Sequence, residues 1–293
     1  MTTTEIATST PGDRVETERA TRSPGVITVL GVELRKLAAQ KRARFALLGC
    51  LVAPLVVTVV LKGQQRPPKD TLYGRHVHDS GFAVALFVLT FATQWVLAFL
   101  TALVAGDIFA SEDHLGTWKT VLTRSVSRTQ IFVAKCFAAC LFATSVLMVL
   151  AASTIASGVM LVGRQSLVGL SGQLILPSNA AVLVSASWAT ALPPLLAFTA
   201  IAVVVSVASR NPAIGMVGPI VLGLVSQLVG WLGGIDTARR LLPTTPFDAW
   251  HGLLTEHRYY GLITQGALVS AGWIAVCLGG ALLIMRRRDI TGG

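Results

Sequence analysis

Long apolar stretches, separated by short polar segments, dominate the pattern of this chain. A helix needs roughly 20 mostly apolar residues to cross the hydrocarbon core of a membrane. Six stretches approach or exceed that length, at Phe45–Leu61, Phe82–Ala105, Ile131–Val162, Ala180–Val207, Ala213–Leu232 and Leu262–Met285. Ten-residue units that alternate apolar and polar positions, typical of membrane β-barrels, do not recur. The pattern therefore predicts an all-α, polytopic membrane protein with six transmembrane helices.

A different pattern precedes the first predicted span, over residues 25–44. Apolar residues recur there at helical spacing, and charged residues fill the remaining positions. The apolar set is Ile27, Leu30, Leu34 and Leu37, and the charged set is Glu33, Arg35, Lys36, Lys41 and Arg42. We expect an amphipathic helix that lies in the headgroup plane. The alternative is a positively charged flank that only sets topology.

Composition supports a membrane protein. Only 13% of the 293 residues are charged, 53% are hydrophobic and the mean hydropathy is +0.68, whereas soluble domains have about 25% charged residues. The net charge of +10 comes from basic residues that bracket the apolar spans. Orientation against an anionic inner leaflet explains this charge more simply than a nucleic-acid partner, which we exclude.

The positions of lysine and arginine predict the orientation, since cytoplasmic segments carry most of them. With the N-terminus inside, 16 of the 24 basic residues are cytoplasmic. Both termini then lie in the cytoplasm, with residues 1–24 as a disordered tail and 289–293 as a short C-terminal tail. Segments 62–81, 163–179 and 233–261 become outer loops. We expect a multi-pass protein of the plasma membrane, corresponding to a bacterial inner membrane.

The segment 107–130, between the second and third spans, should be cytoplasmic. Glu112 and Asp113 suit a helix start, and a short amphipathic stretch follows Gly116. Ser125 and Ser127 can cap the next helix, with Arg128 in its first turn. The pattern predicts a short helix parallel to the membrane, which could carry force from a cytoplasmic partner into the spans.

At these residues the sequence resembles the ABC type 2 exporter permeases. That family has an acidic residue, then Gly-Thr, a leucine-rich turn, a Ser-Arg pair and a lysine in the next helix. The matching positions here are Glu112, Gly116, Thr117, Leu122, Ser127, Arg128 and Lys135. The first amphipathic segment is similar to the family's elbow helix at Glu33, Arg35, Lys36 and Leu37, and Arg286 to Asp289 resembles its usual ending. Many members have a proline where Ser125 stands, so the turn before the third span departs from the family pattern.

The resemblance implies a role for each matched segment. Six residues, Glu112, Gly116, Thr117, Leu122, Arg128 and Lys135, would belong to a coupling segment that docks on an ABC ATPase subunit. A second permease copy or a homologue would complete the transporter within the membrane lipid. ATP and Mg would be bound by the ATPase, because this chain lacks a Gly-x-x-x-x-Gly-Lys-Ser/Thr loop.

Catalytic and metal-binding patterns are absent from the sequence. There is no His-Glu-x-x-His, no Gly-x-Ser-x-Gly and no pair of carboxylates within a span. His76, His78 and Asp79 could ligate a metal, but a solvated loop is the preferred interpretation. We therefore expect no enzyme activity, no cofactor and no metal in this chain.

Polar residues inside spans are candidates for a transport path, because they are costly in lipid. Gln94 and Gln227 are the clearest, and in the resembled family their two spans are thought to line the path. Hydrogen bonding between packed helices explains them equally well. An ion pair or snorkelling would explain Asp107 and Lys135.

The leading hypothesis is a permease that exports a drug-like, lipidic or amphipathic substrate, as in multidrug or antibiotic efflux. The alternatives are a secondary transporter or channel and a membrane anchor that transports nothing.

Overall fold

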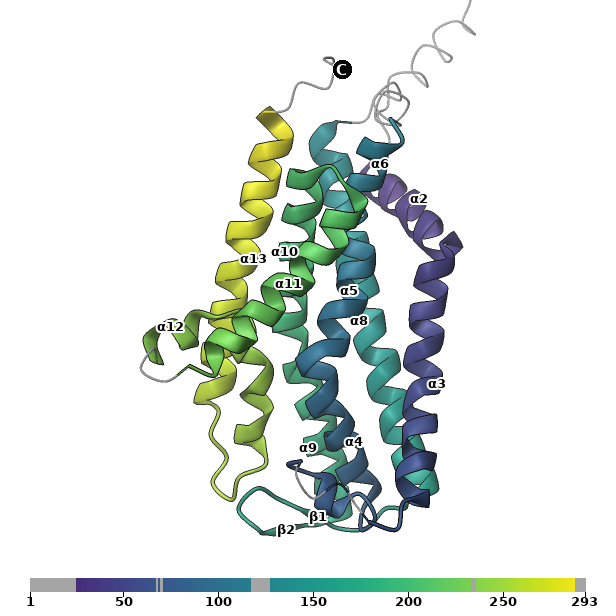
Figure 1. Ribbon diagram of the computed structural model, residues 1–293, viewed down its shortest axis with the longest axis vertical. Helices are drawn as coiled ribbons and strands as arrows, with labels where there is room; N and C mark the ends of the chain where they lie inside the picture. The colour runs from purple at the N-terminus through teal and green to yellow at the C-terminus, as the bar shows by residue number, and fades with distance from the viewer. Residues whose placement is uncertain (1–24, 67, 69–70, 117–126, 233–235, 288–293) are drawn as a thin grey trace, which may run out of the picture.

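The computed structural model describes residues 25–66, 68, 71–116, 127–232 and 236–287. Within these residues, six long apolar helical segments run side by side in alternating directions (Figure 1). They are Lys41–Gly63, Gly81–His114, Arg128–Leu161, Pro177–Ser209, Pro212–Gly230 and Gly261–Arg287. Each is long and apolar enough to cross a membrane, so the predicted all-α, polytopic fold with six transmembrane helices is confirmed.

Three of the six segments are single helices that begin without a proline in their first turn. These are α3 (Lys41–Gly63), α8 (Arg128–Leu161) and α13 (Gly261–Arg287). A fourth, α11 (Pro212–Gly230), begins with a proline in its first turn, where a missing N–H costs no helical hydrogen bond.

The other two segments are composite. The second contains α4 (Gly81–Phe91), the π-helical η2 (Ala92–Val96) and α5 (Leu97–Ala105), and ends in the short α6 (Ala110–His114). The fourth is divided into α9 (Pro177–Thr190) and α10 (Leu192–Ser209). Pro193 and Pro194 lack the backbone N–H that would continue α9, so a new helix starts there.

Helix α2 (Val26–Ala39) precedes the bundle and differs from the prediction in two respects. It ends at Ala39, because Gln40 adopts an extended conformation before α3 begins. Its buried residues are Glu33 and Leu37, whereas Ile27 is 85% exposed. The expectation that Glu33 lies on the polar surface is therefore wrong, and the reason is an ion pair described below. Its place in the headgroup plane stays a prediction.

The centre of the bundle is formed by α8 and α10. Helix α10 packs on α13, α11, α5 and α8, while α8 also contacts α2, α3 and α4. Two glycine pairs let helices touch through their backbones. A Cβ on Gly106 would lie 2.1 Å from the carbonyl oxygen of Gly215, and one on Gly81 would lie 2.2 Å from that of Gly158. The spans are thus held together in part by small residues, as is common in membrane bundles.

One end of the bundle carries short connecting elements. At this end are η1 (Gly74–His76) and the antiparallel pair β1 (Leu167–Val168) and β2 (Leu174–Ile175). Two further connecting elements, α12 (Asp236–Leu241) and η3 (Thr245–Leu253), precede α13. Figure 1 shows that α12 lies beside the bundle, part of the way along it. Helix α2, α6 and the last residues of α13 lie at the opposite end.

Candidate coupling site

The start of α8 sets the position of Lys135. Ser127 caps this helix, as expected: its hydroxyl accepts from the backbone of Gln130, and the Gln130 side chain accepts from the Ser127 backbone. Such a capping box fixes where a helix begins. Lys135 lies about two turns into α8, on the face that turns toward α2 and α6, and its side chain is only 2% exposed.

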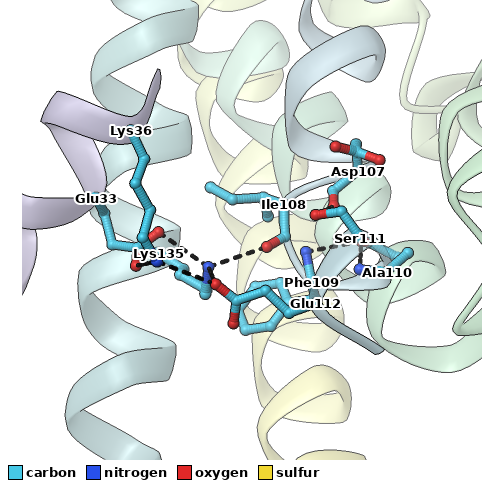
Figure 2. A network of polar contacts seen from close by, with 10 residues as sticks. Glu33, Lys36, Asp107, Ile108, Phe109, Ala110, Ser111, Glu112 and Lys135 are labelled. Carbon is cyan, nitrogen blue, oxygen red and sulfur yellow. Dashed lines mark hydrogen bonds and ion pairs between the residues drawn. The ribbon is translucent and has the colours of Figure 1, made fainter. Parts of the chain in front are cut away.

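The ammonium group of Lys135 makes three polar contacts inside the protein (Figure 2). Its Nζ atom donates to Glu33 Oε2 at 2.9 Å, to Glu112 Oε1 at 2.8 Å and to the carbonyl oxygen of Ile108 at 3.1 Å. A lysine has three donors, so each has an acceptor. The predicted elbow residue Glu33 and the predicted coupling residues Glu112 and Lys135 therefore meet at one point.

Lys36 joins the same cluster from a more exposed position. Its Nζ atom lies 2.9 Å from Glu33 Oε1 and 3.2 Å from Glu112 Oε1. Burial raises the pKa of the Glu33 carboxyl, but Lys135 and Lys36 outweigh burial and hold that pKa below its ordinary value. Burial likewise lowers the pKa of Lys36, and its two carboxylate partners outweigh it and raise that pKa. We call these four residues the Lys135 cluster.

The residues just before and within α6 are tied to other spans as well. The backbone N–H groups of Phe109 and Ala110 donate to Ser206 Oγ on α10, at 3.2 and 3.0 Å. Asp107 forms an ion pair with Arg42 on α3. An ion pair or snorkelling was expected to explain Asp107 and Lys135. The structure shows ion pairs for both, each with other partners, and Lys135 is too deeply buried to snorkel. Arg42 and Ser206 were not predicted as site residues. A buried acid in an apolar stretch needs a cation, and that requirement could have identified Arg42.

The remaining predicted coupling and elbow residues are placed as follows. Gly116 has a left-handed backbone (φ 64°) and directly follows Leu115, which is 71% exposed. Arg128 is the first residue of α8, and Arg35 is exposed on α2. Leu37 is buried in the core. Thr117 and Leu122 lie outside the described residues.

The two glutamines predicted for a transport path are brought together halfway along the bundle. Gln227 Nε2 donates to the backbone oxygen of Gln94 at 2.9 Å. Gln94 lies in the π-helix, where wider turns leave carbonyl groups without the usual helical partner. Both residues line one cavity of about 120 Å³. Hydrogen bonding between helices thus accounts for the Gln227 side chain, and the exposed Gln94 side chain stays a candidate for the path.

A family model described as ABC-2 family transporter protein matches residues 29–230. The chain belongs to this family. The matched range contains the whole Lys135 cluster and five of the six spans, so the permease assignment covers the elements that build the site. The comparison with curated proteins found no match. Permeases of this family generally work with an ATPase subunit, and the six apolar helices make this permease a multi-pass membrane protein.

Proposed function

We propose that this permease is the membrane subunit of an ATP-binding cassette exporter, driven by a separate ABC ATPase that binds ATP and Mg²⁺. The observation that carries this proposal is the Lys135 cluster. It joins α2, α6 and α8, and its Glu112 belongs to the segment that the resemblance identifies as the coupling segment. A partner that moves this segment would act on several spans at once.

The ties of α6 explain how a push could spread through the bundle. Lys135 connects it to α8 and α2, Ser206 connects it to α10, and Arg42 connects the preceding turn to α3. Because packed helices respond as rigid elements, displacement of α6 would rock them between two arrangements rather than bend one locally. ATP binding and hydrolysis in the partner would select between these arrangements, with no bond chemistry in this chain.

A second permease copy or a homologue would cover the face that carries Gln94. This glutamine lies near the middle of the second span with its side chain exposed. A polar side chain is costly in lipid, so a water-filled path between two permeases is a better environment for it. The membrane would be the plasma membrane, with both termini cytoplasmic and with export of a drug-like, lipidic or amphipathic molecule.

ATP turnover tests the proposal. The ABC ATPase that co-purifies with the tagged chain would be assayed in proteoliposomes alone, with the wild-type permease, and with Gly116→Val. Gly116 has a positive φ and follows α6 within the coupling segment, so valine should misdirect the rest of that segment. We expect complex recovery and permease-dependent turnover to fall several-fold.

Gly172→Val is the matched control for this experiment. Gly172 also has a positive φ (83°) and open space around its Cβ position, but it lies between β1 and β2 at the other end of the bundle. The Gly172→Val substitution should cause similar backbone strain and leave turnover near the wild-type rate. If the permease neither recruits the ATPase nor changes its rate, the proposal is wrong. Gradient-driven transport or a passive anchor then becomes the working hypothesis.

A further inference from the structure

Two charged residues of the segment between α11 and α13 lie deep along the bundle rather than at its end. Trp273 is near the middle of α13, and its Nε1 atom donates to the carbonyl oxygen of Leu241 at the end of α12, at 2.9 Å. Arg239 of α12 and Asp248 of η3 line the same cavity as Gln94, which is near the middle of the second span. The segment therefore returns into the bundle and brings both charges to the level of the mid-spans.

The cavity is small and polar. Its lining includes Thr93, Gln94, Gln227, Trp231, Arg239 and Asp248. Its volume is about 120 Å³, whereas pockets for whole drug-sized ligands measure roughly 300–1,000 Å³. It therefore has room for one polar group of a larger molecule.

Arg239 keeps donor capacity for such a group. Its Nη2 atom donates to the carbonyl oxygen of Leu232 at 2.9 Å, and its Nη1 atom lies 3.7 Å from Asp236, whose side chain is 78% exposed. A guanidinium has five N–H donors. The Nε atom is buried and has no hydrogen-bond partner in the part of the chain that the structure describes.

The two charges of the cavity do not neutralise each other. In the described part of the chain, Arg239 pairs with Asp236, and no ion pair joins it to Asp248. Charges at mid-membrane depth are costly unless they find partners. The His251 side chain also interacts electrostatically with the Asp248 carboxylate. Because Arg239 and Asp248 line one cavity without pairing with each other, a group that carries both charges would satisfy both. Trp231, 74% exposed at the same cavity, adds an indole face of the kind that attracts ammonium groups.

An apolar groove begins at Leu241, two residues after Arg239 in the sequence. Leu241 borders it together with Leu268, Trp273 and Val276 of α13, and its volume is about 490 Å³. The groove and the cavity share no lining residue, so an apolar chain attached to the bound group would have to leave the cavity to reach the groove. We propose that the cavity binds the zwitterionic head group of an amphipathic molecule, with Arg239 binding its anionic part and Asp248 its cationic part. This inference rests on the proposed function, because the head-group site would be part of the export path.

Binding of matched alkyl probes tests this assignment. The full-length chain in neutral maltoside detergent would be titrated calorimetrically with hexylphosphocholine, hexyl phosphate and hexyltrimethylammonium. A hydrogen bond to a charged group contributes roughly 1.5–3 kcal/mol, or about tenfold or more in affinity. We expect hexylphosphocholine to bind at least about tenfold more tightly than either singly charged probe.

Charge-removing variants should separate the two parts of the site. Arg239→Gln should weaken hexylphosphocholine and hexyl phosphate about tenfold and leave hexyltrimethylammonium unchanged. Asp248→Asn should weaken hexylphosphocholine and hexyltrimethylammonium about tenfold and leave hexyl phosphate unchanged. Arg240→Gln is the matched control, because Arg240 is exposed beside Arg239 and does not line the cavity. Arg239→Lys keeps the charge and should retain most of the binding. That result would show that the loss in Arg239→Gln comes from the missing charge and not from misfolding. Equal losses for all probes, or the same loss in Arg240→Gln, would overturn the assignment.

Two sources of the head group can be distinguished by competition. The titration would be repeated in phosphatidylglycerol nanodiscs with and without phosphatidylethanolamine. Competition by phosphatidylethanolamine supports the site and identifies its ligand as membrane lipid, whereas undiminished probe binding supports the site and identifies a non-lipid cargo. No ATPase is present in these measurements. Failure of probe binding therefore refutes the head-group site alone, and loss of ATPase coupling refutes the proposed function alone.

Discussion

Replacing Lys135 with methionine is the most informative perturbation of the Lys135 cluster. Methionine preserves an unbranched apolar side chain but removes the ammonium group. Two carboxylates, Glu33 and Glu112, then keep only the half-exposed Lys36 as a cationic partner within the cluster. Their positions, with 7% and 11% of the side chains exposed, give water little access to replace the lost contacts.

The expected loss follows from the contacts. Lys135 makes two charge-assisted hydrogen bonds at 2.8 and 2.9 Å, and each such bond contributes roughly 1.5–3 kcal/mol. Breaking a buried ion pair by removing one partner typically costs about 3–5 kcal/mol. Because Lys36 still offsets part of the carboxylate charge, we expect the free energy of unfolding to fall by about 3 kcal/mol.

Reversible unfolding by dodecyl sulfate in mixed micelles measures this loss. Lys62→Met is the matched control, since Lys62 donates to the Leu161 carbonyl oxygen at 2.8 Å from an exposed position and should lose about 1 kcal/mol or less. Adding Glu33→Gln and Glu112→Gln to the Lys135 variant should recover about half of the stability, because no buried charge is then uncompensated. If the Lys135 and Lys62 variants lose equal stability, the cluster is not a buried ionic network.

Two further predictions concern pH and helix packing. The folded-state pKa of Glu33 is lowered from 4.5 and that of Lys36 is raised from 10.5. The Glu33 contribution to stability is therefore present above pH 4.5 and lost as pH falls through the folded pKa, while that of Lys36 is lost only as pH rises above 10.5. The free energy of unfolding, measured across pH, should fall less at acid pH in Glu33→Gln than in the wild type. Gly106→Ala, whose Cβ would lie 2.1 Å from the α11 backbone, should cost about 1–3 kcal/mol. Gly49→Ala, with open space around it, should be neutral or stabilising in the same assay.

A specific outcome would contradict each of these two predictions. An acid transition that is identical in wild type and Glu33→Gln would mean that Glu33 is not held ionised by its lysine partners. A Gly106→Ala variant as stable as Gly49→Ala would mean that α5 and α11 do not approach through this glycine.

The six spans could be predicted because each depends on local composition alone. Length and apolarity are properties of consecutive residues, and the Ser127 cap likewise depends on a partner three residues away. The inward position of Glu33 could not be predicted in this way. Its partner Lys135 is 102 residues distant, and helical periodicity alone assigns a glutamate to the surface.

The cavity at Arg239 shows the same limit. Sequence identified Gln94 and Gln227 as polar residues within spans, and the structure brings them together with charged residues from 236–253. The segment 233–261 was expected to be an outer loop, since it joins the fifth and sixth predicted spans. Its return into the bundle depends on tertiary contacts such as Trp273 with Leu241, which no local pattern specifies.

Site-specific photo-crosslinking tests the central claim, that an ABC ATPase docks at the α6 end of this permease. A photoreactive residue would replace Leu115, which is 71% exposed beside α6, or Leu174, which is 72% exposed in β2 at the opposite end. In membranes that contain the ATPase, we predict a crosslink to it from Leu115 and none from Leu174. A crosslink from Leu174, or none from Leu115 while the two proteins still co-purify, would contradict the claim.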